Sequence, residues 1–141
     1  MLSYNVLVVD DDAGIRDLLE GLLEEEGYNV AAARNGREAL EVLRKRAELG
    51  PHVILLDLMM PILDGYAVME ALGANPQLRD SHALVVMSAA QRLSDGHFTL
   101  ANALLPKPFA IDDVLETVSQ LTHQITHLNN NGGPDERAAA R

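Results

Sequence analysis

The chain has 141 residues, 48% of them hydrophobic and 23% charged, no cysteine and a formal net charge of −10 at pH 7. This composition predicts one globular domain and excludes disulfides, thiolate metal sites and thiol catalysis. The acidic charge argues against nucleic-acid binding, which requires a basic surface. Because no apolar run reaches the ~20 residues of a membrane span and no secretory signal is visible, we expect a cytoplasmic protein without membrane contact.

Five apolar runs alternate with helical patterns along the chain, as expected for repeated strand–helix units. The predicted strands are Val6–Val9, Val30–Ala33, Val53–Leu58, Ala83–Met87 and Ala103–Leu105. Helices are predicted to begin after Asp12, Asn35 and Asp64, whose side chains can accept hydrogen bonds from the first N–H groups of a helix. Asn75 and Pro76 predict a loop before the fourth strand, and residues 90–101 predict a poor helix before the fifth.

The last helix is the longest regular pattern in the sequence. Its apolar stripe starts at Ile111 and runs to Leu128, about five turns at 3.6 residues each. We therefore expect a domain at residues 1–128, followed by a disordered tail or the start of a linker at residues 129–141. The stripe extends farther than so small a sheet should require, so its end is predicted to contact a partner protein or a second copy in a homodimer.

Polar side chains follow four of the predicted strands where each apolar run ends. Asp10, Asp11 and Asp12 follow the first, Asp57 follows the apolar run 53–56 within the third, and Ser88 and Lys107 come after the last two. Parallel strands bring their carboxyl ends to one edge of a sheet, where ligands bind, so we expect these groups to converge. Carboxylates of like charge need a cation to lie close together. The sequence therefore predicts a cleft for a divalent metal and a phosphoryl group.

Five motifs in a fixed order resemble the receiver domain of two-component response regulators, over nearly the whole chain. They are Asp10-Asp11, Asp57, Met60–Gly65, Ser88-Ala89 and Lys107-Pro108-Phe109. The resemblance implies a flavodoxin-like, doubly wound α/β fold with a five-stranded parallel sheet in order 2-1-3-4-5 and helices on both faces. It also implies a phospho-accepting signalling domain, which catalyses only its own phosphorylation and slow dephosphorylation.

The resemblance assigns a role to each acid at the strand ends. Asp57 resembles the phospho-acceptor, Asp11 a direct carboxylate ligand of Mg²⁺, and Asp10 its partner through water. Asp57 and the backbone carbonyl of Met59 would complete the protein's share of the metal shell. The chemistry agrees, since a carboxylate can act as the nucleophile in phosphoryl transfer and Mg²⁺ prefers one or two carboxylates, waters and a phosphate oxygen.

Ser88 and Lys107 resemble the two remaining functional positions. Ser88 corresponds to a switch hydroxyl that approaches the phosphoryl group, and Lys107 to the lysine that pairs with the phosphate or with Asp57. The Lys107–Pro108 peptide bond is the one that is commonly cis in this family. The implied partners are a histidine kinase or histidine phosphotransfer protein as donor and a downstream effector protein as target.

Two other functions compete with this one: a phosphatase, and a receiver-like scaffold that is never phosphorylated, which is disfavoured because every chemical residue is present. Asp10 to Asp12 also fit the Asp-x-Asp opening of haloacid-dehalogenase-like phosphatases, but Ala13-Gly14 stands where that family needs Thr or Val. The acidic pair that such a phosphatase needs after a late strand is also missing, because Asp112-Asp113 opens a helix. His123 and His127 have the spacing of two metal ligands on a helix, but with no third ligand in view a solvated helix face is favoured.

The sequence departs from the receiver pattern on the side that most often carries the output. Leu104 stands where the family usually has Tyr or Phe, so the familiar coupling through an inward-turning aromatic ring cannot operate as usual. The segment between Ser88 and Lys107 is also shorter than is common. Met59 and Ala90 occupy positions that flank the path of the hydrolytic water in receivers, and neither side chain can orient water, so slow dephosphorylation is expected.

Overall fold

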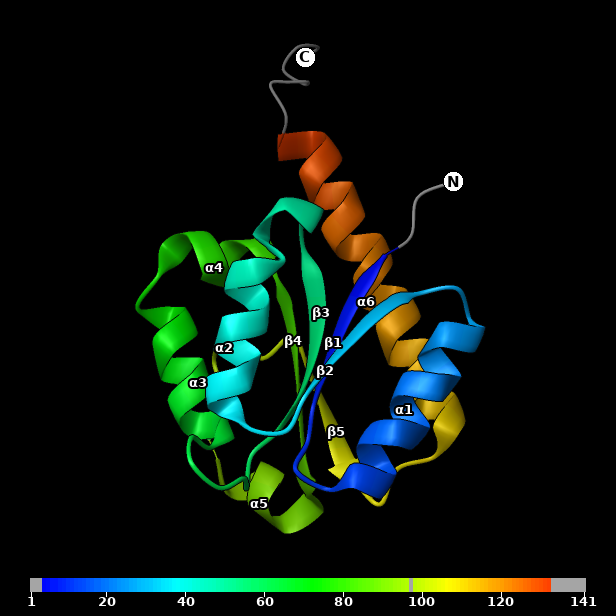
Figure 1. Ribbon diagram of the computed structural model, residues 1–141, viewed down its shortest axis with the longest axis vertical. Helices are drawn as coiled ribbons and strands as arrows, with labels where there is room; N and C mark the ends of the chain where they lie inside the picture. The colour runs from blue at the N-terminus through cyan, green and yellow to red at the C-terminus, as the bar shows by residue number, and fades with distance from the viewer. Residues whose placement is uncertain (1–3, 97, 133–141) are drawn as a thin grey trace.

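Five parallel strands form one sheet in the order β2-β1-β3-β4-β5 (Figure 1). This computed structural model describes residues 4–96 and 98–132, and their side chains other than those of residues 95 and 126–132. The strands are β1 (Asn5–Val9), β2 (Asn29–Ala33), β3 (His52–Asp57), β4 (Ala83–Ala89) and β5 (Ala103–Lys107). The expected fold class and strand order are therefore confirmed.

Helices cover both faces of the sheet (Figure 1). They are α1 (Ala13–Glu25), α2 (Gly36–Lys45), α3 (Gly65–Gly73), α4 (Pro76–Ser81), α5 (Ala90–Asp95) and α6 (Ile111–Gly132), with a short 3₁₀ helix η1 (Ala47–Leu49). The core residues of α1 and α6 pack on one face, whereas those of α2, α3 and α5 pack on the other. Among the described residues, no helix is long and apolar enough to span a membrane.

Alternate residues of the central strands supply the two halves of the core. On β1, Leu7 and Val9 face the α2–α3 side, whereas Val6 and Val8 face the α1–α6 side. Every residue of β1 and β3 is buried, which is what continuous apolar runs predict for strands covered on both faces. The edge strand β5 is less covered, and Leu104 on it is 46% exposed.

Several boundaries differ from those expected. Asn75 and Pro76 begin α4 and do not form a loop, because the Asn75 side chain accepts from the N–H groups of Gln77 and Leu78 and Pro76 occupies the first turn, where its missing N–H costs nothing. The poor helix expected at residues 90–101 ends as α5 at Asp95.

The last helix is longer than expected, since α6 continues through Gly132 and Asn129 lies within it. Extending an existing helix adds one hydrogen bond per residue without a new nucleus, so polar residues can continue it. Residues 133–141 of the expected tail lie outside the described part of the chain.

Strand register determines which side chains meet at the carboxyl edge of the sheet. Val9 is paired with Leu56, Asp57 with Met87, and Ala89 with Lys107. The residues that follow β1 and those that end β3, β4 and β5 therefore lie at the same level, although they are far apart in the sequence. This edge carries the candidate site.

Candidate functional site

Three carboxylates meet at the carboxyl edge of the sheet. Asp10 follows β1, Asp11 is the next residue in the loop, and Asp57 is the last residue of β3. One carboxylate oxygen from each lies within 4.8 Å of the other two. Asp10 is fully buried and Asp57 is 6% exposed, whereas Asp11 is exposed. The structure thus brings together the three acids that follow the first and third apolar runs.

Lys107, the last residue of β5, supplies a positive charge to this cluster. Its Nζ lies 2.9 Å from Oδ2 of Asp10 and 3.4 Å from Oδ1 of Asp57. Burial lowers the pKa of Lys107, but its hydrogen bond and ion pairs with Asp10 and Asp57 outweigh burial and raise the pKa above its ordinary value. The Lys107–Pro108 peptide bond is cis. One ammonium therefore faces two buried carboxylates.

The cluster holds more negative charge than Lys107 offsets. The pKa of Asp57 is raised to about 6, because burial and the charges of Asp10 and Asp11 raise it by more than Lys107 lowers it. A carboxylate that is harder to ionise here than in water indicates a site short of cations. Carboxylate oxygens are also the ligands that Mg²⁺ prefers. The donor set therefore fits a divalent metal ion.

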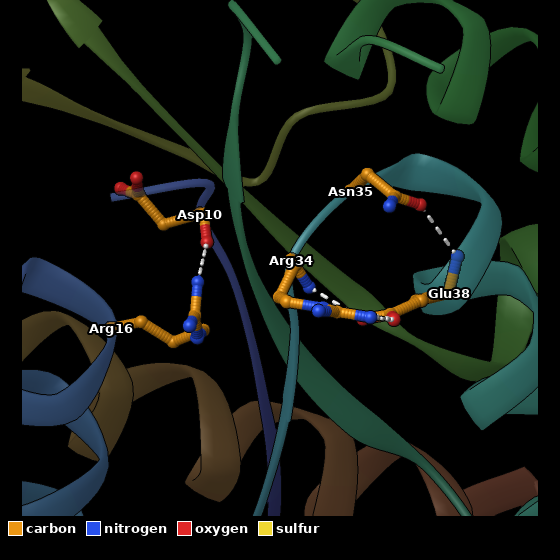
Figure 2. Close-up of polar contacts among 5 residues, drawn as sticks. All are labelled: Asp10, Arg16, Arg34, Asn35 and Glu38. Atoms are coloured by element: carbon orange, nitrogen blue, oxygen red, sulfur yellow. Dashed lines mark hydrogen bonds and ion pairs between the residues drawn. The ribbon is translucent and has the colours of Figure 1, made fainter. Parts of the chain in front are cut away.

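Asp10 is held by four hydrogen bonds. Its backbone N–H donates to the carbonyl of Ala33 at 3.1 Å, and its carbonyl accepts from Nη1 of Arg16 at 2.9 Å (Figure 2). Its carboxylate accepts from the N–H of Asp12 at 2.9 Å and from Lys107 at 2.9 Å. Asp12 in turn accepts from the N–H of Ile15 and caps α1, as expected. These hydrogen bonds therefore fix both the backbone and the carboxylate of Asp10.

Ser88 and Met59, the other two predicted site residues, lie on β4 and in the loop after β3. Asp57 is paired with Met87, so Ser88 lies one residue farther along β4 toward the carboxyl edge, and it is 4% exposed. Met59 is two residues beyond Asp57, and its side chain is 53% exposed. Both residues are placed at the edge where the acids meet.

Asp64 and Gly65 anchor α3 against the strand that ends in Asp57. Asp64 accepts from the N–H of Ala67, and Gly65 donates its N–H to the carbonyl of Leu58 at 2.8 Å. A Cβ at position 65 would lie 2.5 Å from the carbonyl oxygen of Asp57, a distance that real Cβ contacts do not reach. A glycine is therefore required for this close approach, and the hydrogen bond from Ala67 to Asp64 confirms that a helix begins after Asp64.

One member of the histidine pair on α6, His123, is described by the structure. Nδ1 of His123 lies 2.7 Å from the carbonyl oxygen of Ser119, one turn earlier on the same helix, and His123 is exposed. The side chain of His127 lies outside the described residues. Within the described part of the chain, Asp10, Asp11 and Asp57 form the one group of metal-ligating side chains.

Arg16 is a residue of the site that sequence reasoning missed. It is half-buried on the first turn of α1 and donates to the backbone of Asp10. No local pattern indicates this bond, because Arg16 reaches a backbone carbonyl six positions earlier, in the loop before the helix.

Comparisons with known proteins agree with this geometry. Residues 6–119 match the family described as "Response regulator receiver domain". The chain is 36% identical over 128 residues to "Response regulator MprA" of Mycolicibacterium vanbaalenii, covering 89% of this chain and 53% of that protein. The corresponding protein of Mycobacterium ulcerans is 35% identical over 140 residues, with 97% and 57% covered. The chain thus spans about half the length of these curated relatives.

Solved structures show the same fold. A receiver domain protein (CheY-like) from Methanospirillum hungatei superposes with a TM-score of 0.76 at 27% identity, covering 87% of this chain and 97% of that one. The chemotaxis protein CheY4 of Vibrio cholerae superposes with a TM-score of 0.71 at 27% identity, covering 84% and 98%.

The fold and the acidic cluster define a phospho-accepting signalling domain. The chain belongs to the response regulator receiver domain family of two-component systems. It is a signalling phospho-acceptor and not an enzyme that acts on a separate substrate. Membership of this family implies a histidine kinase partner and rules out the phosphatase interpretation.

Proposed function

We propose that Asp57 accepts a phosphoryl group from the phosphohistidine of a histidine kinase or histidine phosphotransfer protein, in a reaction that depends on Mg²⁺. The observation that supports this assignment is the position of Asp57. It is a nearly buried carboxylate at the end of a central strand, with Lys107 at 3.4 Å and two further acids around it. Asp10 is already bonded at both carboxylate oxygens, and Asp11 is exposed.

The transfer itself is a substitution at phosphorus. An oxygen of Asp57 forms the new P–O bond while the P–N bond to the donor imidazole breaks, and the imidazole keeps the electron pair. Mg²⁺ would be held by Asp10, Asp11, Asp57 and the carbonyl of Met59. When bound, the ion would neutralise part of the charge on the phosphoryl oxygens. The product is an acyl phosphate on Asp57.

Lys107 and Ser88 act on the product. Nζ of Lys107 can pair with a phosphoryl oxygen with little movement, because it already lies beside Asp57. The Ser88 hydroxyl donates to another phosphoryl oxygen once the group has arrived, and this shift of β4 changes the neighbouring surface. Leu104 replaces the usual aromatic residue on β5, so the change reaches the surface through the backbone and packing near this edge strand.

The output we propose is protein–protein contact, with an effector protein or a second copy of this chain as the partner. The far part of α6, from residue 126 to Gly132, extends the helix past Ile125, which packs on the core and is the last residue of α6 whose side chain is described. Ending the chain after Ile125 should leave phosphorylation intact and weaken self-association or effector capture. Unchanged association of the truncated phosphorylated protein in analytical ultracentrifugation and in a pull-down would exclude this part of the helix.

The phospho-acceptor assignment is tested by intact-protein mass spectrometry after incubation with acetyl phosphate. The wild-type protein should gain one phosphate with Mg²⁺ and none with EDTA. Asp57→Asn should gain none, whereas Asp112→Asn, which removes an exposed acid of α6, should behave as wild type. A phosphate gain that survives Asp57→Asn would overturn the assignment.

A further inference from the structure

The side chain of Arg16 makes one hydrogen bond to another described residue, and its acceptor is a backbone carbonyl of the acidic loop. Its Nη1 donates to the carbonyl oxygen of Asp10 at 2.9 Å. In Figure 2 the guanidinium approaches this carbonyl, while the carboxylate of Asp10 points to the other side. The N–H of Asp10 is used by Ala33 and its carboxylate by Asp12 and Lys107. Arg16 therefore provides the remaining restraint on Asp10.

This restraint acts directly on Asp11. The carbonyl of Asp10 and the N–H of Asp11 belong to one planar peptide group, so a bond that holds the carbonyl also sets the direction of the next residue. On the other side, the N–H of Asp12 is held by Oδ1 of Asp10 at 2.9 Å. Hydrogen bonds therefore restrain the peptide groups on both sides of Asp11. Its exposed carboxylate makes no hydrogen bond or ion pair to another described residue.

A second arginine on the same rim of the molecule differs from Arg16 in one respect. Arg34 pairs with Glu38 through its backbone N–H, Nε and Nη2, at 2.8, 3.1 and 2.6 Å, and it has no described contact with Asp10 (Figure 2). Both arginines lie near the carboxyl edge of the sheet (Figure 2), but Arg34 is paired with Glu38 and only Arg16 is bonded to the loop.

We infer that Arg16 is a positioning residue of the phosphorylation site: it holds the Asp10–Asp11 peptide so that the free carboxylate of Asp11 is directed to the divalent cation. The inference rests on the proposed function, in which Asp11 is a metal ligand. In this role the three carboxylates would hold the ion, and Arg16 would act only through the backbone of Asp10. Without Arg16, the peptide gains freedom and part of the binding free energy is spent on ordering it.

The experiment is a titration of the metal-free protein with Mg²⁺ by isothermal titration calorimetry. Arg16→Met should weaken Mg²⁺ binding about tenfold, whereas Arg34→Met, which removes the same charge from the same rim, should change it less than about twofold. Arg16→Lys keeps the charge and one donor long enough to reach the carbonyl, so it should recover most of the affinity. The side chain in Arg16→Gln is too short to reach the carbonyl of Asp10, so this variant should bind Mg²⁺ as weakly as Arg16→Met. If Arg16→Met does not fold, Arg16→Gln replaces it in the comparison.

A second measurement separates positioning from a general loss of structure. With acetyl phosphate as donor, Arg16→Met should raise the Mg²⁺ concentration for half-maximal phosphorylation by the same factor and leave the rate at saturating Mg²⁺ within about twofold of wild type. Urea unfolding without Mg²⁺ measures how far Arg16→Met lowers the free energy of unfolding of the metal-free protein.

Equal Mg²⁺ affinity of Arg16→Met and wild type, or equal losses in Arg16→Met and Arg34→Met, would overturn the inference. Failure of the proposed function has a different signature, since Asp11→Asn would then bind Mg²⁺ as well as wild type does, whatever the Arg16 variants show.

Discussion

The two edges of the sheet both bury ionisable groups, but they treat them in opposite ways. At the carboxyl edge, three acids share one ammonium, and burial with mutual repulsion raises the pKa of Asp57 to about 6. At the amino edge, His52 is fully buried at the start of the same strand β3, and burial lowers its pKa to about 4. Strand β3 therefore begins with a histidine whose pKa is lowered and ends with a carboxyl group whose pKa is raised.

The hydrogen bonds explain the difference. Nε2 of His52 accepts from Nε of Arg46 at 3.1 Å, so Nδ1 carries the proton and donates to the carbonyl of Gly50 at 3.0 Å. The N–H of His52 donates to Nδ1 of His82 at 2.9 Å. Both ring nitrogens of His52 are thus satisfied by the protein itself. At the amino edge the protein itself supplies both partners of the buried ring, although Nη2 of Arg46 is buried without a partner among the described residues. At the carboxyl edge one ammonium faces three carboxylates, a set that fits a divalent metal ion.

The largest expected effect tests this division by removing one side chain from each edge. His52→Ala leaves a buried cavity and unpaired partners at Arg46 and Gly50, so it should lower the free energy of unfolding by about 2–4 kcal/mol. Asp11→Ala removes an exposed like charge and should change it by less than about 0.5 kcal/mol, or raise it. Urea unfolding at pH 7 without divalent ions measures both, and equal losses would break the comparison.

The pH dependence of the two edges should run in opposite directions. The pKa of Asp57 is raised from 3.8 to about 6, so the folded state binds the extra proton between these values and the contribution of Asp57 to stability falls as pH rises through that window. The pKa of His52 is lowered from 6.5 to about 4, so the unfolded state binds the extra proton and stability rises with pH there. In the wild-type protein the two slopes oppose each other.

Asp57→Asn separates the two pH dependences. It removes the contribution of Asp57, which falls as pH rises, and leaves that of His52, which rises with pH. Relative to wild type, the variant should be about as stable near pH 4 and more stable by about 1–3 kcal/mol above pH 6. Urea unfolding at four pH values between 4 and 7, in EDTA, checks the difference. A stabilisation of the same size at pH 4 and pH 7 would show that Asp57 does not titrate as described.

Metal binding should stabilise only through the carboxyl edge. Millimolar Mg²⁺ should raise the free energy of unfolding by roughly 1–3 kcal/mol, because it binds the folded state preferentially. Asp11→Asn should abolish this gain without lowering the stability of the metal-free protein. His82→Ala, at the other edge, should be less stable but keep the full gain. A thermal melt of the wild-type protein that does not respond to Mg²⁺ would contradict the prediction.

The smallest effect concerns the lifetime of the phosphorylated state. Met59 and Ala90 are exposed and cannot orient water, so replacing them by Asn and Glu should accelerate loss of the phosphoryl group about tenfold, or about 1.4 kcal/mol in activation free energy. Ile62→Asn, which adds the same amide at an exposed position of the same loop, is the control and should leave the rate unchanged. Loss of label is followed by intact mass at fixed Mg²⁺, and an unchanged rate in the double variant would refute the argument.

Local patterns in the sequence were sufficient for most of the fold. Asp12, Asn35 and Asp64 cap the helices that were assigned to them, because a cap is a bond between residues two or three positions apart. The buried strands were recognisable as unbroken apolar runs, since both of their faces are covered. The prediction of a loop at Asn75 and Pro76 is wrong, because the same residue types begin both loops and helices. The periodicity of the residues that follow is too weak to distinguish the two.

The acids of the site could also be placed from the sequence, because parallel strands bring their carboxyl ends to one edge whatever fills the space between them. What only the tertiary structure decided are contacts between elements: the bond from Arg16 to the backbone of Asp10, and the satisfaction of His52 by Arg46 and Gly50. Such contacts depend on the rotation of each helix about its axis and on the path of each loop. Burial also sets the ionisation of Asp57 and His52, and burial belongs to the packed structure and to no residue alone.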